Sequence, residues 1–98
     1  MSMTDERFCM RHLAPGAPES PYVVRRIWRR MEEDRLTRAT FYDGSVTTAD
    51  GLVHELLECG ALSFALFWEG YLCGAAWFNA FEGRTARGHF TLFRKVWG

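Results

Sequence analysis

Hydrophobic residues follow two different periods along the chain, and the change comes near residue 61. Between Val24 and Met31 they recur three and four positions apart, as on one face of an amphipathic helix. The same spacing returns between Ala49 and Leu57. From Ala61 onward, apolar residues fill most positions of three short runs, which is typical of buried strands. The pattern therefore predicts two helices followed by strands.

The first predicted helix has a start signal in "SPYVVRRIW". Ser20 is expected to be its N-cap, and Pro21 suits the first helical position, where a missing N–H has no consequence. Its apolar stripe contains Val24, Ile27, Trp28 and Met31, and its other faces carry Arg25, Arg26, Arg29 and Arg30. Because three acidic residues follow at 32–34, a solvated face with ion pairs is favoured over a nucleic-acid patch.

A turn at Asp43-Gly44 separates this helix from the second one. Thr47 or Thr48 is expected to cap the second helix, and Gly60 suits the left-handed position at its end. One face of this helix is apolar and comprises Ala49, Leu52, Val53, Leu56 and Leu57.

The strands are predicted from their turn signals. Runs at 61–68 and 71–81 are joined by Glu69-Gly70, a two-residue connection that strongly indicates a hairpin. Residues 82–85, "EGRT", form a second tight connection to a strand at 86–93, and residues 7–13 are a possible first strand. The predicted fold class is α+β, with two helices packed on an antiparallel meander within one domain spanning 1–98.

Both faces of the predicted sheet are apolar. In the central strand, Leu72, Ala76 and Phe78 are expected on one face, opposite Ala75 and Trp77. Two helices cover only one face, so we expect the other face to be buried by a second copy of the chain or by further protein.

Composition excludes several classes of function. The 12 basic and 12 acidic residues give zero net charge, which argues against nucleic acid and against an anionic membrane. No secretory leader or membrane-spanning run is evident. Cys9, Cys59 and Cys73 lack metal-ligand spacing and are expected to be buried thiols, so no metal site is predicted and a cytoplasmic location is expected.

The order of elements and the stretch "FWEGYLCGAAWFNAFEGRTARGHFTLFRKVWG" resemble the N-terminal half of the GNAT superfamily of N-acetyltransferases. In that fold a strand and two helices precede a long meander of strands two to four. "HFTLFRKVWG" resembles strand four running into the loop that binds coenzyme A. The resemblance implies transfer of an acetyl group from acetyl-CoA to an amine whose identity it leaves open.

The resemblance also implies cofactor-binding residues. The pantetheine arm would lie along the strand near Leu92 and Phe93, where a backbone N–H would polarise the thioester carbonyl. Arg94, or Lys95 in its place, and Gly98 would begin the pyrophosphate loop, so the chain would end inside that motif. The 98-residue chain is therefore expected to bind acetyl-CoA weakly or not at all and to transfer no acetyl group.

Two side chains are candidates for the general base of acetyl transfer. Glu82 closes the central strand, and His89 lies on the last one. Histidine changes charge near neutral pH and is the commonest general base. For each of them a structural role is favoured over a catalytic one. Glu82 is then a turn residue, and His89 is a histidine hydrogen-bonded across the sheet. Asn79 is either a substrate contact or a satisfied sheet amide.

Two other functions compete with acyl transfer. The chain is alternatively a stand-alone, self-associating interaction module without catalysis, which the two apolar sheet faces favour. A sheet that binds single-stranded RNA through aromatic side chains is a weaker alternative, because few arginines flank the strands.

Overall fold

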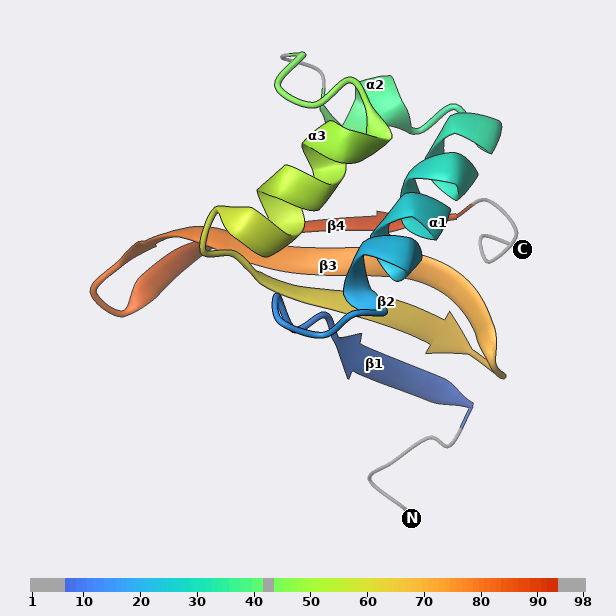
Figure 1. The fold of residues 1–98 in the computed structure, drawn as a ribbon, viewed down its shortest axis with the longest axis horizontal. Helices are drawn as coiled ribbons and strands as arrows, with labels where there is room; N and C mark the ends of the chain where they lie inside the picture. Colours follow the sequence, from blue (N-terminus) through green and yellow to red (C-terminus); the bar gives the residue numbers. More distant parts are fainter. Residues whose placement is uncertain (1–6, 42–43, 94–98) are drawn as a thin grey trace.

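A computed structural model describes residues 7–41 and 44–93 of the chain. Its helices lie on one face of a four-stranded antiparallel sheet (Figure 1). The strands are β1 (Phe8–His12), β2 (Leu62–Trp68), β3 (Tyr71–Glu82) and β4 (Thr85–Leu92), and neighbours in sequence are neighbours in the sheet. The predicted α+β class is confirmed, and the possible first strand is present as an edge strand paired with β2.

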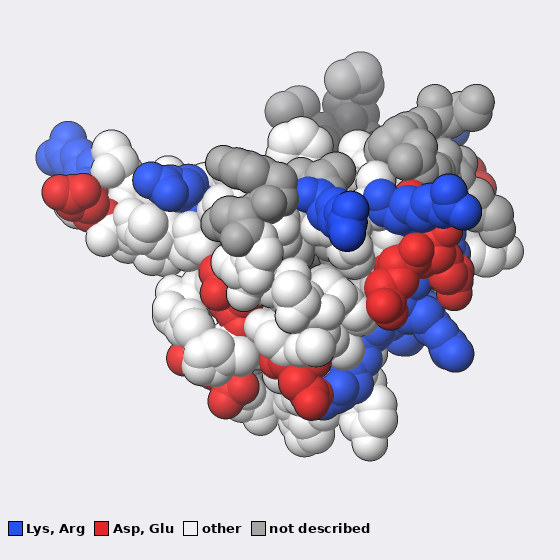
Figure 2. All heavy atoms as spheres, turned by 90° about the horizontal axis from the view of Figure 1, so that it is seen from above, with Lys and Arg blue, Asp and Glu red and all other residues white. Residues whose placement is uncertain are grey.

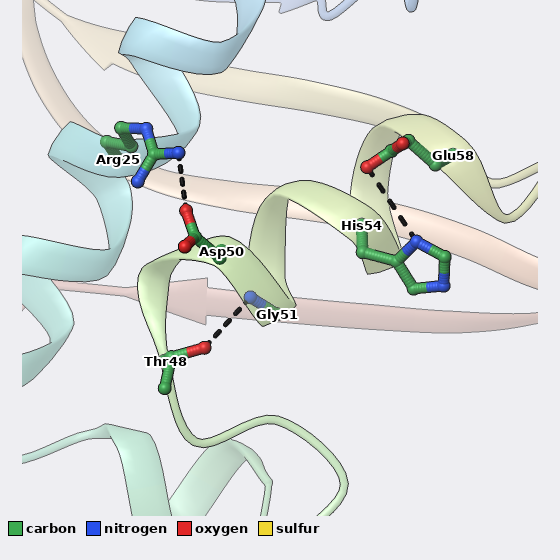
Figure 3. A network of polar contacts seen from close by, with 6 residues as sticks. All are labelled: Arg25, Thr48, Asp50, Gly51, His54 and Glu58. Carbon is green, nitrogen blue, oxygen red and sulfur yellow. Dashed lines mark hydrogen bonds and ion pairs between the residues drawn. The ribbon is translucent and has the colours of Figure 1, made fainter.

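The helical layer consists of α1 (Ser20–Glu33), the short α2 (Thr37–Thr40) and α3 (Ala49–Val53). The last of these continues directly into a π-helical segment, η1 (His54–Glu58). The sequence pattern did not predict α2, because four residues are too few to show a helical period. Figure 3 shows α1 and α3 side by side, joined by an ion pair between Arg25 and Asp50.

The apolar stripe of α1 is buried as predicted, since Val24, Ile27 and Met31 are fully inaccessible to solvent. The prediction for Ser20 is wrong. Its hydroxyl is buried and donates a hydrogen bond to the carbonyl oxygen of Ala14 at 2.7 Å, so it does not cap the helix. A buried hydroxyl needs a partner, and the preceding loop supplies one.

The second helix begins as expected. The Thr48 hydroxyl accepts a hydrogen bond from the backbone N–H of Gly51 at 3.0 Å (Figure 3), and Gly60 has a φ of 77°. The π-helical segment buries both Leu56 and Leu57 against the sheet. Ser63 on β2 donates its hydroxyl hydrogen to the Leu56 carbonyl at 2.9 Å, which ties this segment to the strand.

Both predicted hairpins are present. Trp68 pairs with Tyr71 around Glu69 and Gly70, which both have positive φ, as the favoured two-residue turn requires. Glu82 pairs with Thr85 across the second connection.

A β-bulge in β3 changes the predicted division between the two faces of the sheet. Leu66 pairs with Gly74 and Phe67 pairs with Leu72, so Cys73 is an extra residue in its strand. Leu72 consequently joins Ala75 and Trp77 in the core. Its prediction as a neighbour of Ala76 and Phe78 on the other face is wrong, because strict alternation cannot include an inserted residue.

We name the two sides of the sheet the covered face and the open face. The covered face packs against the helices and includes Ser63, Ala65, Phe67, Leu72, Ala75, Trp77, Asn79, His89, Thr91 and Phe93. Strand alternation and register place the following residues on the open face: Phe8, Met10, His12, Leu62, Phe64, Leu66, Trp68, Tyr71, Gly74, Ala76, Phe78, Gly88, Phe90 and Leu92. No helix among residues 7–41 and 44–93 lies on the open face (Figure 1).

The cysteines differ in accessibility. Cys73 is buried at the bulge, whereas Cys9 and Cys59 are exposed. The expectation of three buried thiols is therefore wrong for two of them, because Cys9 lies on the edge strand and Cys59 follows the end of η1.

Candidate functional site

A hollow with basic and apolar walls lies where α1 approaches the β2–β3 hairpin and the end of β4. Its volume is about 600 Å³. We call it the basic hollow, and it is lined by Arg26, Arg29, Arg30, Gly70, Tyr71, Leu72, Cys73 and Phe93. The arginines stand three and four positions apart and therefore share one face of α1.

The three arginines are held differently. The Arg30 guanidinium lies over the Phe93 ring, with its Cζ atom 5.3 Å from the ring centroid. Its Nε is buried without a hydrogen bond, and the Glu33 carboxylate is 3.6 Å away. Arg26 and Arg29 form no salt bridge with another described residue, in contrast to Arg25, which pairs with Asp50.

The charges elsewhere are mixed. Seen from above, Lys and Arg atoms are interspersed with Asp and Glu atoms, and no broad basic field is visible (Figure 2). The arginines of the basic hollow therefore suit a small anion better than an extended polyanion.

A second hollow, of about 540 Å³, follows the outer edge of β4. We call it the edge groove, and it is lined by Leu36, Thr40 and residues 88–92. In the described part of the chain β4 pairs only with β3, so its other edge has no neighbouring strand. An unpaired edge presents backbone groups that can bind another extended chain.

The direction of the β4 amides follows from one hydrogen bond. The N–H of Phe93 donates to the Cys73 carbonyl at 2.9 Å and therefore points into the sheet. Successive residues of a strand direct their backbone groups to opposite edges. The N–H of Phe90, three positions earlier, thus faces the edge groove.

His89 also lines the edge groove and ends a row of aromatic rings. It stacks on Trp77 with ring centroids 5.4 Å apart, and Trp77 stacks on Phe41 at 5.8 Å. Phe41 in turn contacts Trp28 of α1 at 6.5 Å. The rings hold the imidazole plane in one orientation against the core.

A polar chain fixes the tautomer of His89. The Asn79 amide nitrogen donates to a Glu55 carboxylate oxygen at 3.2 Å, so its amide oxygen is directed at His89. The Nε2 atom of His89 lies 3.1 Å from that oxygen and must donate. In the neutral imidazole, Nδ1 is then the unprotonated nitrogen, which can accept a proton.

The structure brings some of the sequence candidates together and separates others. His89 and Leu92 line the edge groove, and the next residue, Phe93, lines the basic hollow. Glu82 lies at the far hairpin, paired with Thr85, which is four residues and about 13 Å of strand from His89. Arg94, Lys95 and Gly98 lie outside the described residues.

Sequence reasoning missed two parts of this site. The arginines of the basic hollow were interpreted as a solvated face with ion pairs, and whether Arg26 and Arg29 have acidic partners depends on packing. Glu55 received no role, because its contact with Asn79 joins a helix to a strand 24 residues away. A sheet asparagine facing a helical glutamate gives no local signal.

Comparison with protein-family models, curated proteins and solved structures found no match to this chain. Within the described ranges, no helix has the length and apolar character needed to cross a bilayer. The same residues contain no group of three or more His, Cys, Asp or Glu side chains arranged to hold a metal ion.

Proposed function

We propose that this chain provides the acyl-CoA-binding edge of an N-acyltransferase of the GNAT type. The observation that carries the proposal is the basic hollow beside Phe93, at the end of the β4 edge that has no neighbouring strand in the described part of the chain. The element order, a strand and helices followed by an antiparallel meander, agrees with the order that the sequence resemblance implies.

The two hollows match the two chemical parts of coenzyme A. Pantetheine is an extended chain with two amides, which can hydrogen-bond a strand edge as an added strand does. The Phe90 N–H faces the groove where this arm would lie. The phosphates need charged donors, and the guanidinium groups of Arg26 and Arg29 suit them.

The proposed reaction is attack of a neutral amine on the thioester carbonyl carbon. The C–S bond breaks, and coenzyme A leaves as a thiolate that takes up a proton. The proton lost by the amine goes to Nδ1 of His89, which Asn79 and Glu55 hold in the required tautomer. Glu82 has no part, because it lies at the far hairpin.

The hypothesis from the sequence about which backbone N–H polarises the thioester carbonyl needs revision. That hypothesis named the N–H of Leu92 or Phe93. The Phe93 N–H already donates to Cys73 and is not available to the thioester oxygen, whereas the Leu92 N–H faces the outer edge, as the Phe90 N–H does. An outward N–H of β4, such as that of Phe90, takes this role in the proposal, because donors aimed at the developing oxyanion speed acyl transfer.

A titration with acetyl-CoA, followed by amide NMR shifts, tests the proposal. We expect weak, saturable binding, with the largest shifts in residues 26–30 and 88–93. The double variant Arg26→Ala/Arg29→Ala should weaken binding about tenfold or more, because charge-assisted bonds contribute roughly 1.5–3 kcal/mol each. Arg25→Ala is the control, since Arg25 lies on the same helix but pairs with Asp50.

Acetyl-pantetheine, which lacks the nucleotide phosphates, separates the two parts of the site. It should shift residues 88–93 and be insensitive to the arginine variant. No saturable shifts with acetyl-CoA, or equal losses in the Arg25 control, would exclude the proposed site.

The self-associating module remains a second candidate. The specific observation in its favour is the exposure of large apolar side chains on the open face.

A further inference from the structure

The open face is the most apolar surface in the described part of the chain. Its exposed side chains come from all four strands and comprise Phe8, Met10, Leu62, Trp68, Phe78 and Phe90, with exposed fractions of 36–72%. Among the residues that strand register places on this face, the polar ones are His12 and Tyr71, which is 76% exposed. The Arg7 guanidinium also reaches the face, with its Cζ atom 5.1 Å from the centroid of the Trp68 ring.

Close contacts at two glycines shape the open face. The Phe78 ring lies over Gly88, where an added Cβ would be 3.2 Å from the ring. The Leu92 side chain lies over Gly74 in the same way, 3.0 Å from the Cβ position. The two glycines thus let large side chains lie along the sheet, and Phe90, 72% exposed, stands between them.

We propose that the open face is the interface of a homodimer, in which two sheets pack face to face about a twofold axis. Twisted sheets pack in this way in β-sandwiches, with their inner side chains interdigitating. The open face shares Gly88, Phe90 and Leu92 with the edge groove of the acyltransferase proposal. The dimer is therefore tested at Phe78 and Met10, which line neither hollow.

The area of the face agrees with such an interface. A large apolar side chain such as an aromatic one can bury roughly 150–250 Å². At exposed fractions of 36–72%, the six side chains together therefore offer on the order of 500 Å² of accessible surface. Phe64, Leu92 and His12 add to this area. A stable interface buries about 800 Å² per partner, so the six side chains supply more than half of that area.

The composition of the face favours a second copy over other partners. A twofold interface places the same surface on both sides, so any charge would meet a like charge near the axis. On the open face the fixed charge of the described residues is that of Arg7, which lies over Trp68 at the end of β2 and not at the middle of the face. Nucleic acid or an anionic membrane would instead require several basic residues on the face.

Sedimentation equilibrium over a wide range of concentration tests the dimer. The wild-type chain should fit a monomer–dimer equilibrium. Phe78→Lys, on the inner strand β3, should weaken the dimer by about thirtyfold or more, the loss typical of a central aromatic anchor. Met10→Lys, on the edge strand β1, should act in the same direction. Tyr22→Lys is the matched control, because Tyr22 on α1 is 74% exposed and lies on the helical side.

Three outcomes would overturn the proposal. These are a wild-type chain that stays monomeric at every concentration, open-ended assembly instead of a dimer, and equal weakening by the Tyr22 control. Because neither Phe78 nor Met10 lines the basic hollow or the edge groove, failure here would leave the acetyl-CoA titration interpretable on its own.

Discussion

The two faces of the sheet contain similar large side chains but differ greatly in exposure. On β3 and the end of β4, Trp77 and Phe93 are 1% and 0% exposed, whereas Phe78 and Phe90 are 37% and 72% exposed. These residues come from the same two segments of chain. The difference therefore lies in what covers each face and not in hydrophobicity.

Polar groups show why the helices pack where they do. The covered face carries Ser63, Asn79 and His89, which are hydrogen-bonded to the helical layer or to one another. The open face is the more apolar of the two, although it is the more exposed. Buried polar groups need partners, and the helices supply them on only one side.

The largest expected effect comes from exchanging an aromatic residue on each face for alanine. Trp77→Ala should lower the free energy of unfolding by about 3–5 kcal/mol, because a large cavity forms in the core. Phe90→Ala should lower it by less than about 1 kcal/mol in dilute solution, where the chain is monomeric. Urea unfolding measures both, and equal losses would contradict the distinction between the faces.

A smaller effect is expected where the open face is closely packed. Gly74→Ala should destabilise the fold by about 1–3 kcal/mol through overpacking, since the added Cβ would meet the Thr91 carbonyl oxygen and the Leu92 side chain. Gly16→Ala is the control, because nothing lies within 4 Å of its Cβ position. Thermal unfolding of the two variants compares them, and a neutral Gly74 variant would show that this contact is not tight.

The smallest expected effect is on the pH dependence of stability, and it comes from the thiol at the bulge in β3. Burial raises the pKa of the Cys73 thiol above its ordinary value of 9.0. The unfolded chain then loses this proton at lower pH than the folded chain does. The contribution of the thiol to the free energy of unfolding is therefore fully present below the pKa of the unfolded state and is lost as pH rises from that pKa through the pKa of the folded state.

Unfolding measured between neutral and alkaline pH checks this sign. Cys73→Ala should reduce the alkaline loss of stability, whereas Cys9→Ala, at an exposed thiol, should leave it unchanged. An unchanged slope in the Cys73 variant would show that this thiol does not cause the loss.

Local pattern was sufficient to predict much of the fold. The stripe of α1, the Thr48 cap and the turn at Glu69 and Gly70 all follow from short-range rules about periodicity and backbone conformation. Leu72 was misplaced because a bulge arises from pairing with another strand, and Ser20 because its partner is a loop carbonyl. Such features depend on contacts between distant segments.

The candidate site was less predictable than the fold. His89 and the end of β4 were identified from the resemblance to a family, and the structure joins them to hollows. The link from Glu55 through Asn79 to His89 joins three elements, and no spacing within one element indicates it. The arginines were visible in the sequence, but their common direction toward Phe93 was not.

The contrast between the faces is tested most directly by fluorine NMR of the chain labelled with fluorophenylalanine. Signals of Phe78 and Phe90, assigned by substitution, should shift as protein concentration rises, because association buries them. The signal of Phe93 should stay constant, since its ring is already buried in the core. Constant signals for all three, or a Phe93 signal that shifts as much as that of Phe90, would contradict the account.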